Sequence, residues 1–340
     1  MSPNPPLLAQ TREPEAPPAS RFLDLIHDKL LATELVFRQH LASDVPFIQN
    51  AGQYIFAGGG KRMRPAMLLL AARLLERDSD EEVTYAAVVE LIHTATLVHD
   101  DIIDHATLRR GQATVNRVWG NSRTVLLGDW LYTTAMQMAL RHDNIEVIRR
   151  LCEATLRMTE GELLALERLG ALDLTVEEYF RIIERKTAQL FVAACTIPSL
   201  MRPERPGAGE ALARYGQALG NCFQLVDDLL DFTACERELG KPVLSDLKEG
   251  KLTLPLIVLL PRLDAKRRRL IDMVLEDGDF KRVAPDQILE LVASGGTLAE
   301  VDDMAERYAE EARRELAHFS PSAARDALEF APDFVLQRRS

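Results

Sequence analysis

Hydrophobic residues recur with helical spacing along almost the whole chain. The pattern starts near residue 22, where one helical face collects Phe22, Leu23, Ile26, Leu30 and Leu35. Apolar residues three and four positions apart fall on one side of an α-helix, whereas strands alternate at every second residue. Convincing alternating segments are scarce, so the pattern predicts an all-α protein.

Two long helices are predicted from their apolar residues. Residues 83–98 are apolar on nearly every side apart from Glu90 and His93, which indicates a buried central helix. Residues 212–231 form a second long candidate. A shorter helix is predicted to begin at Thr175, because the acidic residue three positions later completes a capping-box pattern, and to run to residue 187.

Proline and glycine mark the expected breaks between helices. Loops are predicted at residues 198–209 and 240–242. Residues 1–20 contain six prolines and little that can pack, so a disordered tail is expected there. No shift in composition divides residues 21–340. We therefore expect a single-domain multi-helix bundle with its active-site cavity between the central helices.

Two aspartate runs interrupt this apolar pattern. Asp100 and Asp104 belong to HDDIID, and Asp227, Asp228 and Asp231 belong to VDDLLD. Carboxylates four residues apart lie on one helical face, where they repel each other, and apolar neighbours make their charges costlier. A shared cation would relieve both problems. Carboxylates together with substrate phosphates are typical ligands of Mg²⁺, so the runs predict a Mg²⁺ site for a phosphate-bearing substrate.

Composition narrows the class of protein. Hydrophobic residues make up 47% of the 340 residues, which is enough for a sizeable core. The net charge of −11 argues against a general nucleic-acid binder, whose surface would be basic. Cys152, Cys195, Cys222 and Cys235 lack metal-site spacing and are expected to be reduced. No apolar run reaches the roughly 20 residues of a membrane span, and no signal-peptide pattern is present, so a cytoplasmic protein is predicted.

A glycine run followed by cations is the first candidate partner of the aspartates. In GGGKRMRP (residues 58–65), Lys61 and Arg64 would lie close together at the start of a helix, whose N-terminus favours anions. The segment is not a Walker A loop, because Ile55 and Arg62 stand where that loop needs glycine and Ser/Thr. A diphosphate site and an ordinary turn with solvated cations both remain open from this segment alone.

Further cations follow each aspartate run. Arg109 and Arg110 are adjacent, so their side chains point in different directions and can meet two anions, although a charge pair at a helix end has the same sequence. Lys241 and Lys251 follow the second run and are candidate phosphate ligands, whereas Lys248 is expected to be solvated.

Three other residues carry weak signals by themselves. Lys186 and Thr187 end the predicted helix that begins at Thr175. His93 lies seven residues before Asp100 and therefore on the same helical face, two turns earlier. A lone histidine in such a place is more often a core residue than a ligand.

The chain resembles the trans-isoprenyl diphosphate synthases, also called polyprenyl synthetases, from about residue 20 to about residue 335. The matching segments are GGGKRMRP, HTATLVHDDIID, LRRGQATVN, LLGDWLY, ERKTAQLF, QLVDDLLDF and GKPVLSDLKEGKLTLP. Residues 224–255 look most like the long-chain members. Ala113 departs from the proline usual in the family, but it lies outside the ligand positions.

The resemblance implies a fold of the isoprenoid synthase type, a homodimer, and a role for each candidate. Mg²⁺ would be held by Asp100, Asp104, Asp227, Asp228 and Asp231. The family's allylic-diphosphate contacts match Arg109, Lys186, Thr187, Gln224, Lys241 and Lys251. Its isopentenyl-diphosphate contacts match Lys61, Arg64, His93 and Arg110, which raises His93 from core residue to ligand.

The implied reaction joins isopentenyl diphosphate to an allylic diphosphate. Metal ions and cations, with Lys186 and Lys241 among the catalytic residues, stabilise the diphosphate as it leaves. The double bond of isopentenyl diphosphate attacks the allylic cation, and a proton is then lost. No Ser, Cys or His nucleophile is required.

Small residues before Asp100 predict a long product. A helix rises about 1.5 Å per residue, so Ala95 and Thr96 lie roughly 6–8 Å below Asp100, where short-chain relatives carry a bulky aromatic residue. Ile92 and Met136 are expected to form the lower wall of the product tunnel, with Val88 near them. We expect six or more isoprene units. Geranylgeranyl or farnesyl diphosphate synthesis, and a non-catalytic subunit of a heteromeric synthase, remain the alternatives.

Overall fold

The computed structural model describes residues 23–202, 206–233 and 243–339, and these are almost entirely helical. The only strands among them are β1 (Leu108–Arg109) and β2 (Gln112–Ala113), which pair antiparallel as a short hairpin. The all-α prediction is therefore confirmed. The predicted tail at residues 1–20, and Lys241, lie outside the described residues.

The first half of the described chain builds the helices around the first aspartate run. In chain order they are α2 (His27–His40), α3 (Pro46–Ala57), α4 (Met63–Leu74), α5 (Glu81–Ile103), α6 (Val115–Trp119), α7 (Asn121–Ala139), the 3₁₀ turn η1 (Leu140–His142) and α8 (Ile145–Glu167).

The second half carries the second aspartate run and the C-terminal helices. In chain order they are α9 (Val176–Ile183), a π-turn (Glu184–Ala188), α10 (Gln189–Met201), α11 (Ala208–Thr233), α13 (Ser245–Lys248), α14 (Leu254–Leu259), η3 (Leu260–Arg262), α15 (Ala265–Asp277), α16 (Pro285–Gly295), α17 (Thr297–Glu315), η4 (Leu316–His318), α18 (Ala323–Leu336) and η5 (Gln337–Arg339).

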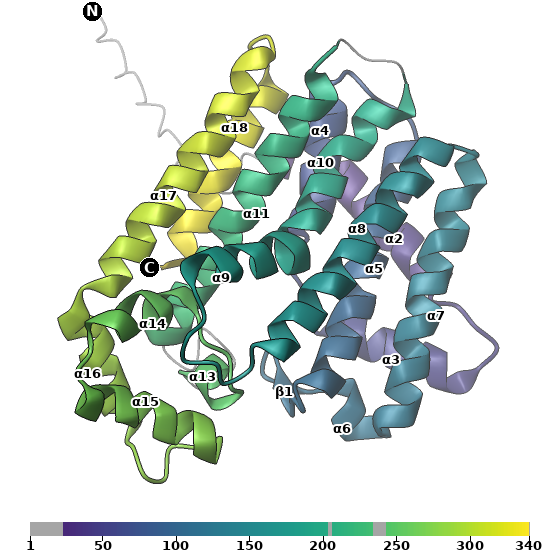
Figure 1. Cartoon of the computed structure of the whole chain (residues 1–340). Helices are drawn as coiled ribbons and strands as arrows, with labels where there is room; N and C mark the ends of the chain where they lie inside the picture. Colours follow the sequence, from purple (N-terminus) through teal and green to yellow (C-terminus); the bar gives the residue numbers. More distant parts are fainter. Residues whose placement is uncertain (1–22, 203–205, 234–242, 340) are drawn as a thin grey trace, which may run out of the picture.

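Helices α5 and α11 are the long central helices, as the sequence predicted. α5 packs against α2, α4 and α7, while α11 packs against α10, α17 and α18. In Figure 1, α17 and α18 lie on the opposite side of the molecule from α7, with α11, α10, α8 and α5 between them. Each central helix ends with an aspartate run, so the fold sets the two runs on separate helices of one bundle.

The helix predicted to begin at Thr175 does so, but it does not end at Thr187. Thr175 caps α9, and its capping box with Glu178 is formed. The chain then passes through the π-turn and continues as α10 to Met201. The apolar stretch after Thr187 is almost wholly buried, so tertiary packing extends the helix beyond the polar residues that had suggested its end.

The loop predicted at residues 198–209 is shorter than expected at both ends. Pro198 lies inside α10, and α11 already begins at Ala208. Pro198 lacks the N–H that would donate to the Ala194 carbonyl, but the helix continues past it to Met201. Proline thus failed as a boundary marker here.

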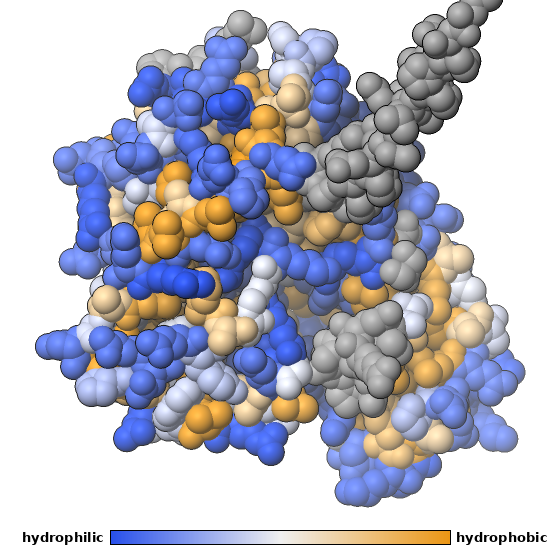
Figure 2. Space-filling view, turned by 180° about the vertical axis from the view of Figure 1, so that it is seen from behind, coloured by the Kyte–Doolittle hydropathy of each residue, from blue (hydrophilic) through white to orange (hydrophobic). Residues whose placement is uncertain are grey.

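The surface mixes hydrophilic and apolar residues. From behind, hydrophilic residues cross the middle of the molecule and apolar residues form separate patches (Figure 2). Within the described residues, no helix combines the length and apolar character needed to cross a membrane.

Candidate active site

The first aspartate motif (residues 100–104) lies at the C-terminal end of α5. Asp100 is in the last turn, and Asp104 directly follows the final helical residue. Asp104 Oδ2 lies 2.7 Å from Lys251 Nζ, and 14% of the Asp104 side chain is exposed. Asp101 is instead buried and accepts a 2.7 Å hydrogen bond from Arg109 Nε. The motif therefore divides into the Asp100–Asp104 pair, which has Lys186 and Lys251 as cationic neighbours, and one aspartate that anchors the hairpin.

Negative charge is concentrated around Asp100. Burial raises the pKa of Asp100 to about 6; Glu162 and Asp104 raise it further, while Lys186 opposes them. For Lys251, burial lowers the pKa but the carboxylates of Asp104 and Glu249 more than offset this, so its pKa is raised. The carboxylates are thus partly compensated by lysines and would gain from a further cation.

The second aspartate motif (residues 227–231) lies on α11 and differs from the first. Only the Asp227 side chain is substantially exposed, at 47%, and it lies 3.5 Å from the Arg338 guanidinium. Asp228, 2% exposed, accepts hydrogen bonds from Tyr179 Oη (2.6 Å), Gln224 Nε2 (2.9 Å) and the Leu254 N–H (3.3 Å). Burial raises the pKa of Asp228 to about 7, although these donors oppose the rise.

Asp231 is held by the start of α13. It is 1% exposed and accepts hydrogen bonds from the Ser245 N–H and hydroxyl and from the Asp246 N–H. The Lys251 N–H in turn donates to the Asp246 carbonyl. Asp231 therefore shapes the turn that delivers Lys251 to Asp104.

The donor set fits a hard divalent cation. Among residues 23–202, 206–233 and 243–339, no three His, Cys, Asp or Glu side chains are spaced to hold a metal ion by themselves. Carboxylate oxygens from two helices instead leave positions for phosphate oxygens and water, which is how proteins usually hold Mg²⁺.

The π-turn brings Lys186 and Thr187 to this site. Lys186 Nζ lies 2.5 Å from Glu162 Oε2 of α8, and the Thr187 hydroxyl donates to Gln224 Oε1 at 2.7 Å. A Cβ atom on Gly161 would come within 2.5 Å of the Lys186 backbone nitrogen. Glycine at position 161 is therefore what lets α8 approach the π-turn so closely.

Among the cations of residues 61–64, Arg64 contacts His93, whereas Arg62 forms an internal ion pair. Arg64 NH1 lies 3.1 Å from His93 Nε2, and its guanidinium stacks over the Phe191 ring at 4.6 Å. Burial lowers the Arg64 pKa to about 10 and, together with Arg64, holds the pKa of His93 well below its usual range. Neutral His93 thus accepts from Arg64. Arg62, with left-handed backbone, instead pairs with Glu90 at 2.5 Å.

Arg109 and Arg110 point to different partners, as expected. Arg109 bonds Asp101, whereas Arg110 donates to the Gly59 carbonyl. Arg110 and Gly111 both have positive φ angles, so the turn between β1 and β2 is tight enough to separate the two side chains.

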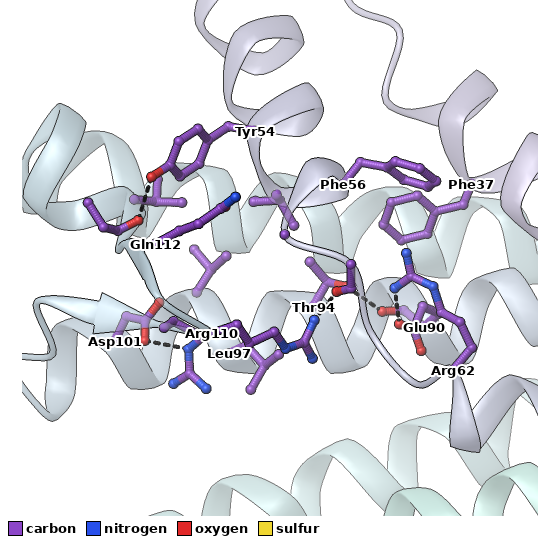
Figure 3. A pocket seen from close by; sticks show the side chains of 17 residues that line it. Phe37, Tyr54, Phe56, Arg62, Glu90, Thr94, Leu97, Asp101, Arg110 and Gln112 are labelled. Carbon is purple, nitrogen blue, oxygen red and sulfur yellow. Dashed lines mark hydrogen bonds and ion pairs between the residues drawn. The ribbon is translucent and has the colours of Figure 1, made fainter. Parts of the chain in front are cut away.

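A hollow of about 660 Å³, including its open mouth, adjoins this cationic side of the site. It lies between α3, α5 and the hairpin, with the Arg62–Glu90 pair at one end, Asp101 at the other and aromatic rings along one wall (Figure 3). Among the described candidate residues, only Arg109 and Arg110 line it. The hollow is thus lined by two of the candidate cations, Arg109 and Arg110, and does not include the aspartate pairs.

The candidate tunnel wall runs down α5 below Asp100. Ile92 and Ala95 are buried, and Met136 on α7 packs partly buried against the same core. The Thr96 hydroxyl donates to the His93 carbonyl at 2.8 Å, so it needs no other partner. Helices α5 and α7 pack along each other, and a tunnel wall made of these residues stays a prediction.

Sequence reasoning missed Tyr179, Glu162 and Arg338. Glu162 is one of several acidic residues on α8, so nothing in the sequence singles it out. Tyr179 lies seven residues before Lys186, a helical spacing that offered a usable signal. Arg338 reaches Asp227 from the end of the chain, and no local pattern predicts that contact.

Comparison with known proteins agrees with this geometry. The sequence model of the polyprenyl synthetase family matches residues 45–292. The chain is 39% identical to octaprenyl diphosphate synthase of Escherichia coli K12, over 88% of this chain and 93% of that protein. A polyprenyl synthase from Caulobacter crescentus, complexed with calcium and isoprenyl diphosphate, superposes with a TM-score of 0.91 at 35% identity, covering 95% and 98% of the two chains.

A decaprenyl diphosphate synthase from Rhodobacter capsulatus has the same fold, with a TM-score of 0.89 at 34% identity over 95% of this chain and 100% of that one. With the family pattern matched over most of the chain and the two aspartate motifs in place near the ends of α5 and α11, this protein belongs to the polyprenyl synthetase family.

Proposed function

We propose that the protein condenses isopentenyl diphosphate head-to-tail with an allylic diphosphate and releases diphosphate, in a Mg²⁺-dependent reaction. The product is a long-chain all-trans polyprenyl diphosphate of six or more isoprene units, made by one catalytic domain, residues 21–340. The observation that carries this proposal is the arrangement of two aspartate motifs, on α5 and α11: Lys251, Arg338 and Arg109 pair with their aspartates, and Lys186 lies near Asp100.

Asp100, Asp104 and Asp227 would hold the metal. When bound, Mg²⁺ would neutralise the charge that develops on the departing diphosphate. Asp228 and Asp231 were also expected as ligands, but their oxygens already accept hydrogen bonds from buried donors. We therefore assign the metal contact of the second motif to Asp227 and a supporting role to the other two.

The cations divide between two diphosphates. Arg109, Lys186, Thr187, Gln224 and Lys251, with Lys241, would bind the allylic diphosphate. Lys61, Arg64, His93 and Arg110 would bind isopentenyl diphosphate, with neutral His93 holding the Arg64 guanidinium in place. In the structure, Lys186 and Lys251 pair with Glu162 and Asp104, so substrate binding would exchange these carboxylates for phosphate oxygens.

The remaining chemistry needs no protein nucleophile. Lys186 and its neighbours orient the allylic diphosphate and stabilise it as the C–O bond breaks. The allylic cation then reacts with the double bond of isopentenyl diphosphate, and the released diphosphate takes the proton. Apolar side chains of α5 below Asp100, among them Ala95 and Ile92, would keep water away from the cation.

The direct test is to incubate the protein with Mg²⁺, farnesyl diphosphate and labelled isopentenyl diphosphate and to resolve the products. Chains of six or more units would support the proposal. Products that stop at geranylgeranyl length would favour the shorter-chain alternative. No product at all from the folded chain would favour a non-catalytic subunit, although this chain keeps both aspartate motifs and the glycine run.

Replacing Met136 with tryptophan is expected to shorten the product by one or more isoprene units. Met136 packs partly buried beside the α5 wall, so a larger ring there would block a chain that grows downward from Asp100. Chromatography of the dephosphorylated products measures the shift. Met138→Trp is no suitable control because Met138 is buried in the core, so Met136→Leu serves instead. An unchanged length distribution in Met136→Trp would remove Met136 from the wall.

We also propose a homodimer in the cytoplasm. Large apolar side chains are exposed on α7 and α8, including Leu126 (66%), Leu156 (62%) and Leu163 (56%), and a second copy would cover them. Light scattering of the purified chain should give about twice the monomer mass; a monomer mass at micromolar concentration would contradict this assignment. The scattered cysteines support a reducing compartment.

A further inference from the structure

The π-turn (Glu184–Ala188) is the one segment between α9 and α10 that departs from α-helical geometry. It is pressed between two helices: a Cβ on Gly161 of α8 would lie 2.5 Å from the Lys186 nitrogen, and one on Gly220 of α11 would lie 2.6 Å from the Ala188 Cα. Such turns are rare, occur mostly as single bulges inside α-helices, and are frequent at functional sites.

Hydrogen bonds connect a residue before the π-turn and a residue within it to one carboxylate. Before the turn, Tyr179 Oη donates to Asp228 Oδ2 at 2.6 Å. Thr187 is the fourth residue of the π-turn. Its hydroxyl donates to Gln224 Oε1 at 2.7 Å, and Gln224 Nε2 donates to Asp228 Oδ1 at 2.9 Å. The backbone from 179 to 187 and these side chains form a closed ring. We call it the Tyr179 clamp.

The clamp is buried, and both carboxylate oxygens of Asp228 accept hydrogen bonds. Tyr179 is 5% exposed and Asp228 is 2% exposed. The Leu254 N–H adds a third donor to Asp228, at 3.3 Å. Burial, and then the Asp228 charge, raise the pKa of Tyr179 well above its usual value, so its hydroxyl remains a donor. Without that hydroxyl, Asp228 Oδ2 would keep only the longest of these bonds.

We propose that Tyr179 is a positioning residue for the allylic diphosphate, acting through the clamp to hold the π-turn in place. If the turn relaxed to α-helix, the chain after it would shift by one residue, a rotation of about 100°. Lys186 and Thr187 would then no longer face Glu162 and Gln224 together. This inference rests on the proposed function, which places both residues at the allylic diphosphate.

The proposal predicts a selective defect in Tyr179→Phe. We expect kcat/KM for farnesyl diphosphate to fall about tenfold, the typical effect of losing a hydrogen bond to a charged group. The KM for isopentenyl diphosphate should change less than about twofold, because the clamp touches none of Lys61, Arg64 and His93. Amides 184–188 should also exchange hydrogen faster than in the parent protein.

Tyr215→Phe is the matched control. Tyr215 is a fully buried tyrosine on α11 whose hydroxyl donates to the Leu328 carbonyl at 2.7 Å. Its loss should lower the thermal midpoint without changing either KM or the exchange of residues 184–188. A double variant, Tyr179→Phe with Thr187→Val, should be little worse than the poorer single variant, because both break the same ring.

Two results would overturn the proposal. One is unchanged exchange at residues 184–188 in Tyr179→Phe; the other is an equal loss for both substrates that follows the loss of thermal stability. If the parent chain makes no prenyl product, the proposed function fails instead, and the exchange comparison still decides whether the clamp holds the π-turn.

Discussion

Replacing Asp104 with alanine is expected to lower kcat by about 10³-fold, the scale of losing a group that stabilises transition-state charge. Asp104 is one of the two first-motif carboxylates left for a metal, because Asp101 is bonded to Arg109. Its loss also leaves Lys251 without the carboxylate 2.7 Å away. The diphosphate would then depart with less positive charge in place to receive it.

The measurement is steady-state turnover with saturating farnesyl and isopentenyl diphosphates across a Mg²⁺ titration. Asp303→Ala, which removes an exposed carboxylate from α17, is the control and should keep parental turnover. Asp227→Ala should resemble Asp104→Ala, since it removes the exposed carboxylate of the second motif. Near-parental rates in both aspartate variants would contradict the assignment of Asp104 and Asp227 as metal ligands. They would also contradict the proposal that this site is the active site.

Replacing Lys186 with alanine is expected to lower kcat/KM for the allylic diphosphate by about 10²-fold. Lys186 supplies positive charge beside Asp100, and its partner Glu162 would be left as an unpaired, 14% exposed carboxylate. Two carboxylates would then face the incoming diphosphate without their counter-charge. The effect on the KM of isopentenyl diphosphate should be small, because that substrate meets other cations.

Lys248→Ala provides the matched control, since Lys248 is an exposed lysine at the end of α13. It should behave like the parent protein. A second variant, Lys186→Ala with Glu162→Gln, should recover part of the loss, because it removes the uncompensated charge together with its partner. Equal effects of Lys186→Ala and Lys248→Ala would show that Lys186 is only a surface charge.

The sequence was sufficient for the parts of the fold that depend on local pattern. The buried helix carrying the first motif, the capping box at Thr175 and the long helix carrying the second motif all follow from apolar spacing and cap chemistry. The family resemblance was confirmed as well. Each of the three helical features depends on the sequence of a single helix and its cap.

The remainder depends on contacts between distant segments. The π-turn was invisible because Lys186-Thr187 looked like a polar helix end, whereas packing against Gly161 and Gly220 continues the helix. Likewise, the DDxxD spacing does not predict which of its aspartates are buried and hydrogen-bonded. The structure distinguishes Asp227 from Asp228 because Tyr179 and Leu254, which come from other helices, take up the oxygens of Asp228.

The lysine–carboxylate pairs have a consequence for how binding responds to salt. Lys186 pairs with Glu162 and Lys251 with Asp104 in the structure, so each lysine would exchange a carboxylate for a phosphate when the diphosphate binds. The electrostatic free energy gained on binding is only the difference between the new lysine–phosphate pair and the lost lysine–carboxylate pair, although the diphosphate carries several charges. Substrate affinity should therefore vary less with ionic strength than the number of cations around the site suggests.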